Sequence, residues 1–124
     1  MKEERNIITI DEQGRLNMPT DTVSVWMTES EIVELFGTTA GAVHTGIKTI
    51  FKENALHDYE VRKYVRLENG NRADVYNLEM VVALAFRLNT YPASVFRKWL
   101  VKTTTAPRRT TPPIVIRYKD GLLN

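Results

Sequence analysis

Residues 27–48 have the sequence MTESEIVELFGTTAGAVHTGIK, and this stretch decides the predicted fold. Thr28 followed three residues later by Glu31 is a capping box, which begins a helix by satisfying backbone N–H groups of its first turn. An apolar face at helical spacing follows, and Gly37 ends the helix because glycine takes the left-handed backbone conformation without strain. Thr39 can cap a second helix, so the stretch predicts a helix-turn-helix.

The second helix is expected over about residues 40–51, and it carries the predicted DNA contacts. In a helix-turn-helix the second helix enters the major groove with its N-terminal residues towards the base edges. Its outward positions are Thr39, Ala40, Gly41, His44, Thr45, Lys48 and Lys52. We expect His44 and Thr45 to hydrogen-bond base edges, and the two lysines to neutralise phosphates. Gly41 and Gly46 count against a stiff recognition helix, because each costs roughly 1 kcal/mol relative to alanine.

A basic β-hairpin is predicted shortly after these helices. Asn69-Gly70 lies between two apolar stretches, and this pair favours a type I′ turn, whose central residues both need positive φ. The hairpin carries Arg62, Lys63, Arg66 and Arg72. Two helices followed by a basic hairpin is the winged-helix arrangement. We expect Arg62, Arg66 and Arg72 on the wing to contact phosphates.

Further elements are expected on both sides of this unit. They are an N-terminal β-hairpin from residues 7–10 and 15–18, a short strand over 23–27, a buried helix over 78–88 capped by Asn77, a helix from Pro92 to about Lys102, an extended arm over 103–113 and an edge strand over 114–118. Arg108 and Arg109 on the arm are further predicted phosphate contacts.

The predicted fold class is therefore α+β: a winged helix-turn-helix-like domain with an N-terminal β-hairpin and two C-terminal helices. The predicted segments are residues 1–22, 23–102 and 103–124, which hold the hairpin, the winged domain and the arm.

The net charge of +2 hides an asymmetry along the chain. Residues 1–36 carry three basic and eight acidic side chains, whereas residues 37–124 carry fourteen basic and seven acidic ones. A one-sided cationic surface raises the local concentration of polyanions such as nucleic acid. A solvated basic tail would give the same count, so charge alone leaves both interpretations open.

Composition excludes several kinds of chemistry. The 124 residues include no cysteine, so disulfides, thiolate metal sites and cysteine nucleophiles are absent. His44 and His57 have no carboxylate at metal-ligand spacing, and we expect no metal and no cofactor. The apolar run from Met80 to Phe86 is too short to span a membrane, and the charged N-terminus leads into no signal-peptide core. A cytoplasmic, single-domain protein is expected.

Several blocks in series resemble the RhuM-type virulence-associated protein family. They are residues 25–28, 34–36, 47–53, 76–80, 86–89 and 96–99, within a span of about 23–102. The resemblance implies a bacterial DNA-binding or regulatory protein with no established enzymatic activity. The chain departs from the family at Thr45 and Gly46, where the family usually has a serine and a histidine. It also departs at residues 103–107, where the family usually continues a helix.

The favoured function is a non-enzymatic DNA-binding regulator of transcriptional or phage type, with double-stranded DNA as partner and a homodimer as one possible state. The alternative is a protein–protein interaction adaptor that uses the same fold, with the acidic N-terminal third or the tail as its contact surface. A helix pair with a structural role alone also fits the pattern, and an enzyme is the most distant alternative.

Overall fold

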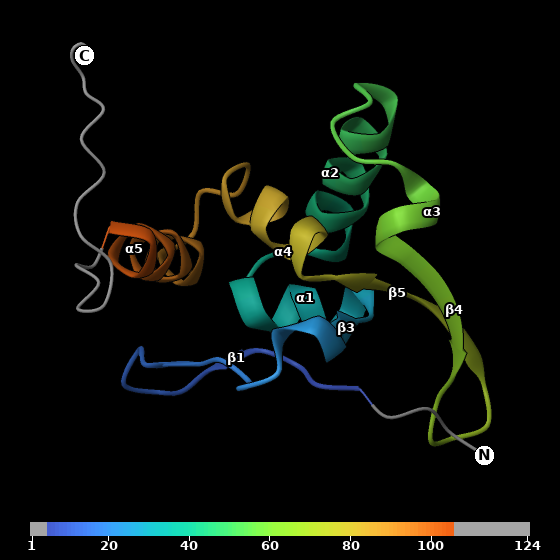
Figure 1. Cartoon of the computed structure of the whole chain (residues 1–124), viewed down its shortest axis with the longest axis horizontal. Helices are drawn as coiled ribbons and strands as arrows, with labels where there is room; N and C mark the ends of the chain where they lie inside the picture. The colour runs from blue at the N-terminus through green and yellow to red at the C-terminus, as the bar shows by residue number, and fades with distance from the viewer. Residues whose placement is uncertain (1–4, 106–124) are drawn as a thin grey trace, which may run out of the picture.

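The computed structural model describes residues 5–105 of the chain. Over this range it holds five α-helices, a short 3-10 helix and two small antiparallel sheets, so the fold is mixed α+β (Figure 1). The elements in chain order are β1 (Thr9–Ile10), β2 (Leu16–Asn17), η1 (Thr22–Ser24), β3 (Trp26–Met27), α1 (Glu29–Phe36), α2 (Ala40–Lys52), α3 (Asp58–Val61), β4 (Arg62–Arg66), β5 (Arg72–Asn77), α4 (Leu78–Ala85) and α5 (Tyr91–Thr105).

The larger sheet connects the segment before the first two helices with the hairpin after them. Its strand order is β3-β5-β4, with both neighbouring pairs antiparallel. Met27 of β3 lies opposite Tyr76 of β5, and Arg62 of β4 lies opposite Tyr76 on the other side. The smaller sheet is the β1–β2 hairpin. The chain just before that hairpin joins the larger sheet through a parallel bridge between Asn6 and Val25.

One hydrophobic core joins the helices to the larger sheet. Helix α2 packs on α1 and on α4, and α5 packs on α1 and α4 at the side of the molecule away from the β4–β5 hairpin (Figure 1). Phe36 and Phe96 meet edge to face in this core, with ring centroids 5.6 Å apart. The Thr90 hydroxyl donates to the Phe36 carbonyl at 2.6 Å and accepts from the Ala93 N–H at 3.2 Å. This one side chain therefore ties the end of α1 to the start of α5.

The predicted helix-turn-helix and both hairpins are confirmed as local structure. Thr28 and Glu31 form the capping box of α1, and Gly37 ends that helix with φ 58°. The Thr39 side chain accepts from the Ala42 N–H and caps α2. Asn77 likewise caps α4 by accepting from the Met80 N–H. The capping residues therefore set the helix starts as the sequence predicts.

Several predicted boundaries are wrong. Helix α4 ends at Ala85 instead of residue 88, because the Arg97 guanidinium donates to the carbonyls of Ala85 and Leu88 at 2.7 and 2.9 Å. Helix α5 continues to Thr105, three residues past its predicted end at about residue 102. The division of the chain after residues 22 and 102 stays a prediction, and Ile8 of the first segment packs in the main core.

Two local predictions also need correction. The strand expected over residues 23–27 is shorter, because the Asp21 side chain accepts from the Val23 N–H and caps the 3-10 helix η1. The segment between α2 and β4, expected to be a linker, contains the four-residue helix α3. The edge strand predicted over residues 114–118 lies outside the described residues.

The turn of the β4–β5 hairpin also differs from the type I′ turn predicted. Gly70 has φ 87°, but Asn54 is the one non-glycine residue within 5–105 with a positive φ, so Asn69 does not share the left-handed conformation. The Gly70 N–H donates to the Leu67 carbonyl, and the Leu67 N–H donates to the Asn71 carbonyl. This is a tight turn followed by a single left-handed glycine, which is the usual three-residue alternative.

Candidate nucleic-acid interface

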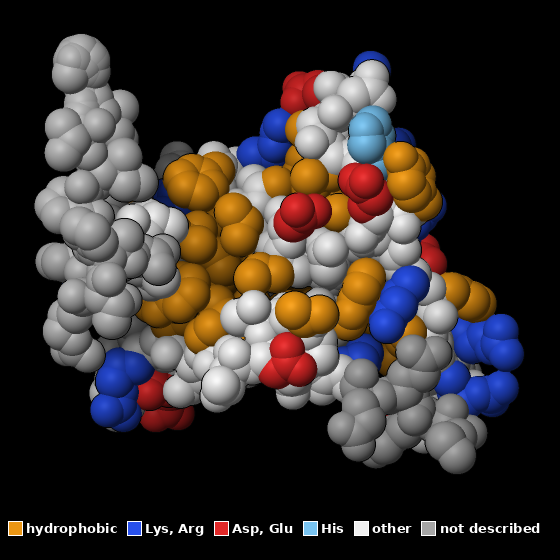
Figure 2. All heavy atoms as spheres, in the orientation of Figure 1, with side chains coloured by type: hydrophobic (Ala, Val, Ile, Leu, Met, Phe, Trp, Pro, Cys, Tyr) orange, Lys and Arg blue, Asp and Glu red, His pale blue; other side chains and the backbone are white. Residues whose placement is uncertain are grey.

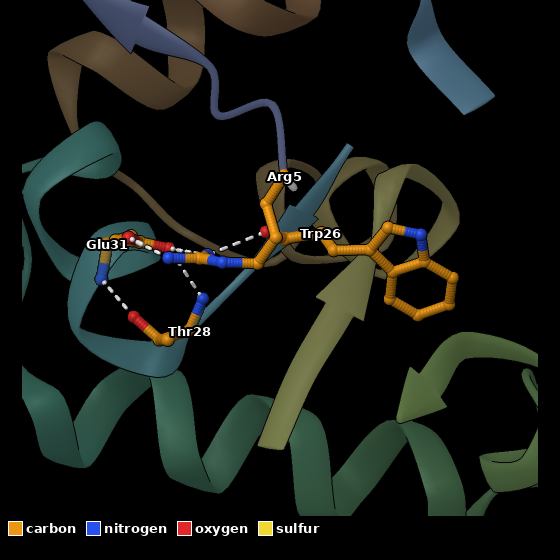
Figure 3. A network of polar contacts seen from close by, with 4 residues as sticks. All are labelled: Arg5, Trp26, Thr28 and Glu31. Atoms are coloured by element: carbon orange, nitrogen blue, oxygen red, sulfur yellow. Dashed lines mark hydrogen bonds and ion pairs between the residues drawn. The ribbon is translucent and has the colours of Figure 1, made fainter. Parts of the chain in front are cut away.

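The start of α1 is held in place by a clasp of polar side chains, which we call the Arg5 clasp: Arg5, Thr28 and Glu31 (Figure 3). The Arg5 guanidinium donates to both carboxylate oxygens of Glu31, at 2.7 and 3.1 Å, and to the Trp26 carbonyl at 2.9 Å. Glu31 also accepts from the Thr28 N–H at 2.9 Å, and Thr28 accepts from the Glu31 N–H at 3.1 Å. A two-point arginine–carboxylate contact fixes orientation as well as position.

The clasp shifts the ionisation of its members. Burial works against the charged form of Glu31, but the hydrogen bonds from Arg5 and from the Thr28 backbone outweigh it and lower the pKa of Glu31. The hydrogen bond to Glu31 raises the pKa of Arg5. Sequence reasoning identified the capping box but missed Arg5, because nothing local marks a contact between residues 26 positions apart. The clasp fixes the start of the helix pair.

Helix α2 has one buried and one exposed face. Val43, Ile47 and Ile50 are buried in the core. The predicted DNA-contacting residues of this helix are exposed: Thr39, Ala40, Gly41, His44, Thr45, Lys48 and Lys52. The oxygen of Thr39 is already used as the N-cap, so that side chain also serves the helix itself. The structure therefore brings these seven residues to one solvent-facing side of α2 and the turn before it.

The two glycines of α2 have different surroundings. A Cβ at Gly46 would lie 2.7 Å from Leu84 Cδ2 of α4, so a larger residue there would force the buried Leu84 side chain to shift. A Cβ at Gly41 would meet only Thr39 Oγ1, at 4.0 Å. Gly46 thus belongs to the core contact, which the sequence did not reveal, whereas Gly41 leaves the backbone of the first turn open to solvent.

His44 contacts an acidic side chain across the two helices. Its Nδ1 lies 3.5 Å from Oε1 of Glu29, the first residue of α1. The His44 side chain remains 61% exposed and the Glu29 side chain 34% exposed. The sequence predicted an exposed His44, as the structure has it, but did not predict its acidic neighbour on α1.

The exposed end of the β4–β5 hairpin carries two arginines directly opposite each other. The strand register pairs Arg66 with Arg72 and Tyr64 with Asp74. Like charges in directly opposite positions mildly destabilise a sheet, and an anion bound between the two arginines would relieve their repulsion. Arg72 also lies over the Tyr64 ring, 5.8 Å from its centroid, and Tyr64 is 60% exposed. Figure 2 shows Lys and Arg side chains gathered on the side of the molecule where this hairpin lies.

Arg62, predicted as a phosphate contact, is occupied within the molecule. Its guanidinium pairs with Asp58 of α3 and with Asp74 of β5, the latter at 3.7 Å. It also lies over the Phe51 ring of α2, 5.7 Å from the centroid. Arg62 therefore braces the base of the hairpin against α2, and less of its charge is available to a ligand than that of Arg66 or Arg72.

The arginine face of the hairpin meets α2 at the hairpin base, where Arg62 lies over the Phe51 ring. Successive alternate residues of a strand share a face, so Arg62, Tyr64 and Arg66 lie on the same face of β4. At its base this face holds Arg62 against Phe51 of α2, and its far end carries Arg66 and Arg72. We call the combined surface the α2–hairpin surface, defined by Lys48, Lys52, Arg66 and Arg72.

The cations of this surface have no acidic partner among the residues that the structure describes. Among residues 5–105, no acidic side chain lies within ion-pair distance of Lys48, Lys52, Arg66 or Arg72. Other arginines are used internally, as Arg87 pairs with Glu53 at 2.7 Å. Arg108 and Arg109, the remaining predicted contacts, lie outside the described residues.

Neither a metal centre nor a membrane span emerges from the described part of the chain. Residues 5–105 bring no three histidine, aspartate or glutamate side chains together around a possible metal position. None of the helices within that range is both long and apolar enough to cross a membrane.

Comparison with a set of protein-family models, with curated proteins and with solved structures gave no match to this chain. The similarity to the RhuM-type family stays a prediction from the sequence blocks quoted above.

Proposed function

We propose that the protein is a non-enzymatic DNA-binding regulator of winged-helix type, with α2 in the major groove and the β4–β5 hairpin as the wing. The observation that carries this proposal is the α2–hairpin surface. Its four cations, Lys48, Lys52, Arg66 and Arg72, have no ion-pair partner within residues 5–105. Two of them face each other across strands, where like charges are costly unless an anion lies between them.

The shape of α2 also suits a DNA groove. The major groove, about 12 Å wide, admits an α-helix. The first turn of α2 carries only small side chains outward, Ala40 and Gly41, so its backbone can come close to a phosphate. His44 and Thr45 follow on the exposed side and offer groups that hydrogen-bond base edges.

The strand order supports a wing. Strand β3, which precedes the two helices, pairs with β5, the second strand of the hairpin, and β4 lies outermost. This is the arrangement of a winged helix, in which the hairpin extends beside the recognition helix. The resemblance of residues 23–102 to the RhuM-type family favours the same function.

Salt-dependent DNA binding tests the proposal. Fluorescence anisotropy of a labelled mixed-sequence duplex is measured from about 50 to about 200 mM salt. Four neutralised phosphates give a log–log slope of about −3.6, which is about a 150-fold loss of affinity over that range. Lys48→Ala and Arg72→Ala should each weaken binding and each make the slope shallower by about 1.

Lys98→Ala provides the matched control, because Lys98 is exposed on α5, away from the α2–hairpin surface. It removes the same charge and should leave the slope of the wild-type protein unchanged. Absence of binding at the lowest salt would contradict the proposal, and so would equal effects of the three variants.

A second candidate, the protein-interaction adaptor, is favoured by a hollow of about 310 Å³ between β1 and α1. It is lined by residues 7–10, Glu31, Glu34 and Leu35, and Ile7 is 40% exposed beside it. Its apolar lining, together with Glu34, the lining acid that lies outside the Arg5 clasp, suits an extended peptide of alternating apolar and basic residues. Calorimetry with such a peptide should then show binding that Ile7→Asp removes and Lys48→Ala leaves unchanged.

A further inference from the structure

The contact between His44 and Glu29 lies on the exposed side of α2 and joins the two helices. Nδ1 of His44 is 3.5 Å from Oε1 of Glu29, and both side chains reach solvent. Within the part of the chain that the structure describes, Glu29 is the acidic side chain within ion-pair distance of His44. The pair is therefore an isolated acid–imidazole contact placed among residues that face the proposed DNA.

The charged and titratable groups around the pair are few. On α2 itself, Lys48 lies one turn after His44 and disfavours a second positive charge there. On β5, Tyr76 has a raised pKa, first because of burial and also because of the nearby Glu29 charge, so its hydroxyl stays neutral in the physiological range. Glu29 itself is contributed by α1.

Protonation would change what His44 offers to a ligand. A neutral imidazole has one donor and one acceptor nitrogen, whereas the protonated ring donates from both. Because Nδ1 is the ring nitrogen that lies beside Glu29, the Nε2–H of the protonated ring would be the donor left for a phosphate oxygen or for guanine O6 or N7. A bound anion next to His44 stabilises the same protonated form. By linkage, protonation then strengthens binding of the anion to an equal degree.

We propose that His44 and Glu29 make DNA binding proton-linked: the complex takes up a proton on His44, and Glu29 is the positioning residue that orients the ring. This inference rests on the proposed DNA-binding function. Histidine is the side chain that ordinarily changes charge between about pH 5 and pH 8, so affinity rises as pH falls through that range. When His44 is neutral, the Glu29 carboxylate faces the phosphates unbalanced and weakens binding.

The experiment is DNA-binding anisotropy at fixed low salt, at about pH 6 and about pH 8. A single linked proton can change affinity by at most about tenfold per pH unit, and we expect binding about 5–10-fold tighter at the lower pH. His44→Gln should reduce the ratio of the two affinities to less than about twofold, within the precision of such a comparison. Glu29→Gln should shrink the ratio mainly by tightening binding at the higher pH.

Two controls separate this effect from a general one. His57→Gln removes the other histidine, an exposed residue stacked on Tyr59, and should keep the full wild-type ratio. Lys48→Ala should weaken binding at both pH values and still leave binding tighter at the lower pH. His44→Asn serves as a second variant if His44→Gln does not unfold cooperatively like the wild type.

The outcomes distinguish the two proposals. Equal wild-type affinity at the two pH values, or an unchanged ratio in His44→Gln, overturns the proton linkage and leaves the DNA-binding function standing. No binding at either pH overturns the function, and the linkage with it. If Glu29→Gln keeps the wild-type ratio of affinities at the two pH values, His44 remains the group that takes up the proton, and the positioning role of Glu29 is excluded.

Discussion

The Arg5 clasp and the α2–hairpin surface use the same kinds of residue in opposite ways. In the clasp, the Arg5 guanidinium has both oxygens of Glu31 and a backbone carbonyl as partners, and its side chain is only 17% exposed. On the α2–hairpin surface, Arg66 and Arg72 lie exposed and opposite each other, with no acid within ion-pair distance among residues 5–105. An arginine that is paired with a carboxylate inside the molecule stabilises the fold, whereas an arginine without such a partner is available to a ligand.

The largest expected effect comes from breaking the clasp. Arg5→Ala removes the partner of a partly buried carboxylate, and we expect the free energy of unfolding to fall by about 2 kcal/mol. Thermal or urea unfolding measures it. The slope of DNA affinity against salt should stay at its wild-type value, because Arg5 is not part of the α2–hairpin surface. A lower slope would mean that the clasp also contacts DNA.

The two glycines of α2 sharpen the comparison between its buried and exposed faces. Gly46→Ala forces a Cβ towards the buried Leu84, and we expect a loss of stability of about 1 kcal/mol after the gain in helix propensity. Gly41→Ala has open space and should stabilise the helix by up to about 1 kcal/mol. Urea unfolding of both variants gives the difference, and equal effects would contradict the close contact of α2 with α4.

Acid should reduce the stability that the Arg5 clasp contributes to the fold. Because the pKa of Glu31 is lowered in the folded protein, its stabilising contribution is complete above its unfolded pKa and is lost as pH falls through the folded value. Asp11, whose pKa is lowered by the Arg15 backbone N–H, titrates in the same window, so the wild type alone does not isolate Glu31. At neutral pH, Glu31→Gln should be less stable than the wild type because it loses hydrogen bonds to the carboxylate. The loss of the negative charge itself should lower the free energy of unfolding by less than about 1 kcal/mol more. The difference in unfolding free energy between Glu31→Gln and the wild type should become smaller below about pH 4.5. A difference that does not change with pH would exclude the charged contact.

The smallest expected effects are the changes in stability when two arginines of the hairpin are replaced. Arg62→Ala loses contacts with Asp58, Asp74 and Phe51, and we expect a destabilisation of up to about 1 kcal/mol, as for exposed ion pairs. Arg66→Ala removes one of two opposed like charges and should change stability by less than about 0.5 kcal/mol. Chemical unfolding of both variants checks this order, and a larger loss for Arg66→Ala would place it among the bracing residues.

The local parts of the fold were predictable because their signals lie within a few residues. Thr28, Thr39 and Asn77 cap helices through side chains that reach only three residues along the chain. Gly37 and Gly70 take the positive φ that their turns need. The exposed face of α2 followed from helical spacing alone. These features need no knowledge of the tertiary structure.

Contacts between distant segments could not be predicted in this way. Thr90 bonds to the Phe36 carbonyl across 54 residues, and Arg97 ends α4 from the next helix. Which helices and strands meet decides the close packing around Gly46, the pairing of Arg62 and the contact of His44 with Glu29. The four residues of α3 are too few to show a helical period. The candidate side chains could therefore be identified from the sequence. Only the packing shows which of them already have partners inside the molecule.

The most direct test of the central claim compares two pairs of cations in the salt dependence of DNA binding. Arg66→Ala/Arg72→Ala and Lys98→Ala/Lys102→Ala remove the same formal charge, the first from the hairpin and the second from α5. We expect the hairpin pair to make the log–log slope shallower by about 2 and the α5 pair to leave it at the wild-type value. Equal changes in slope would mean that net charge alone attracts DNA, and would contradict a defined α2–hairpin surface.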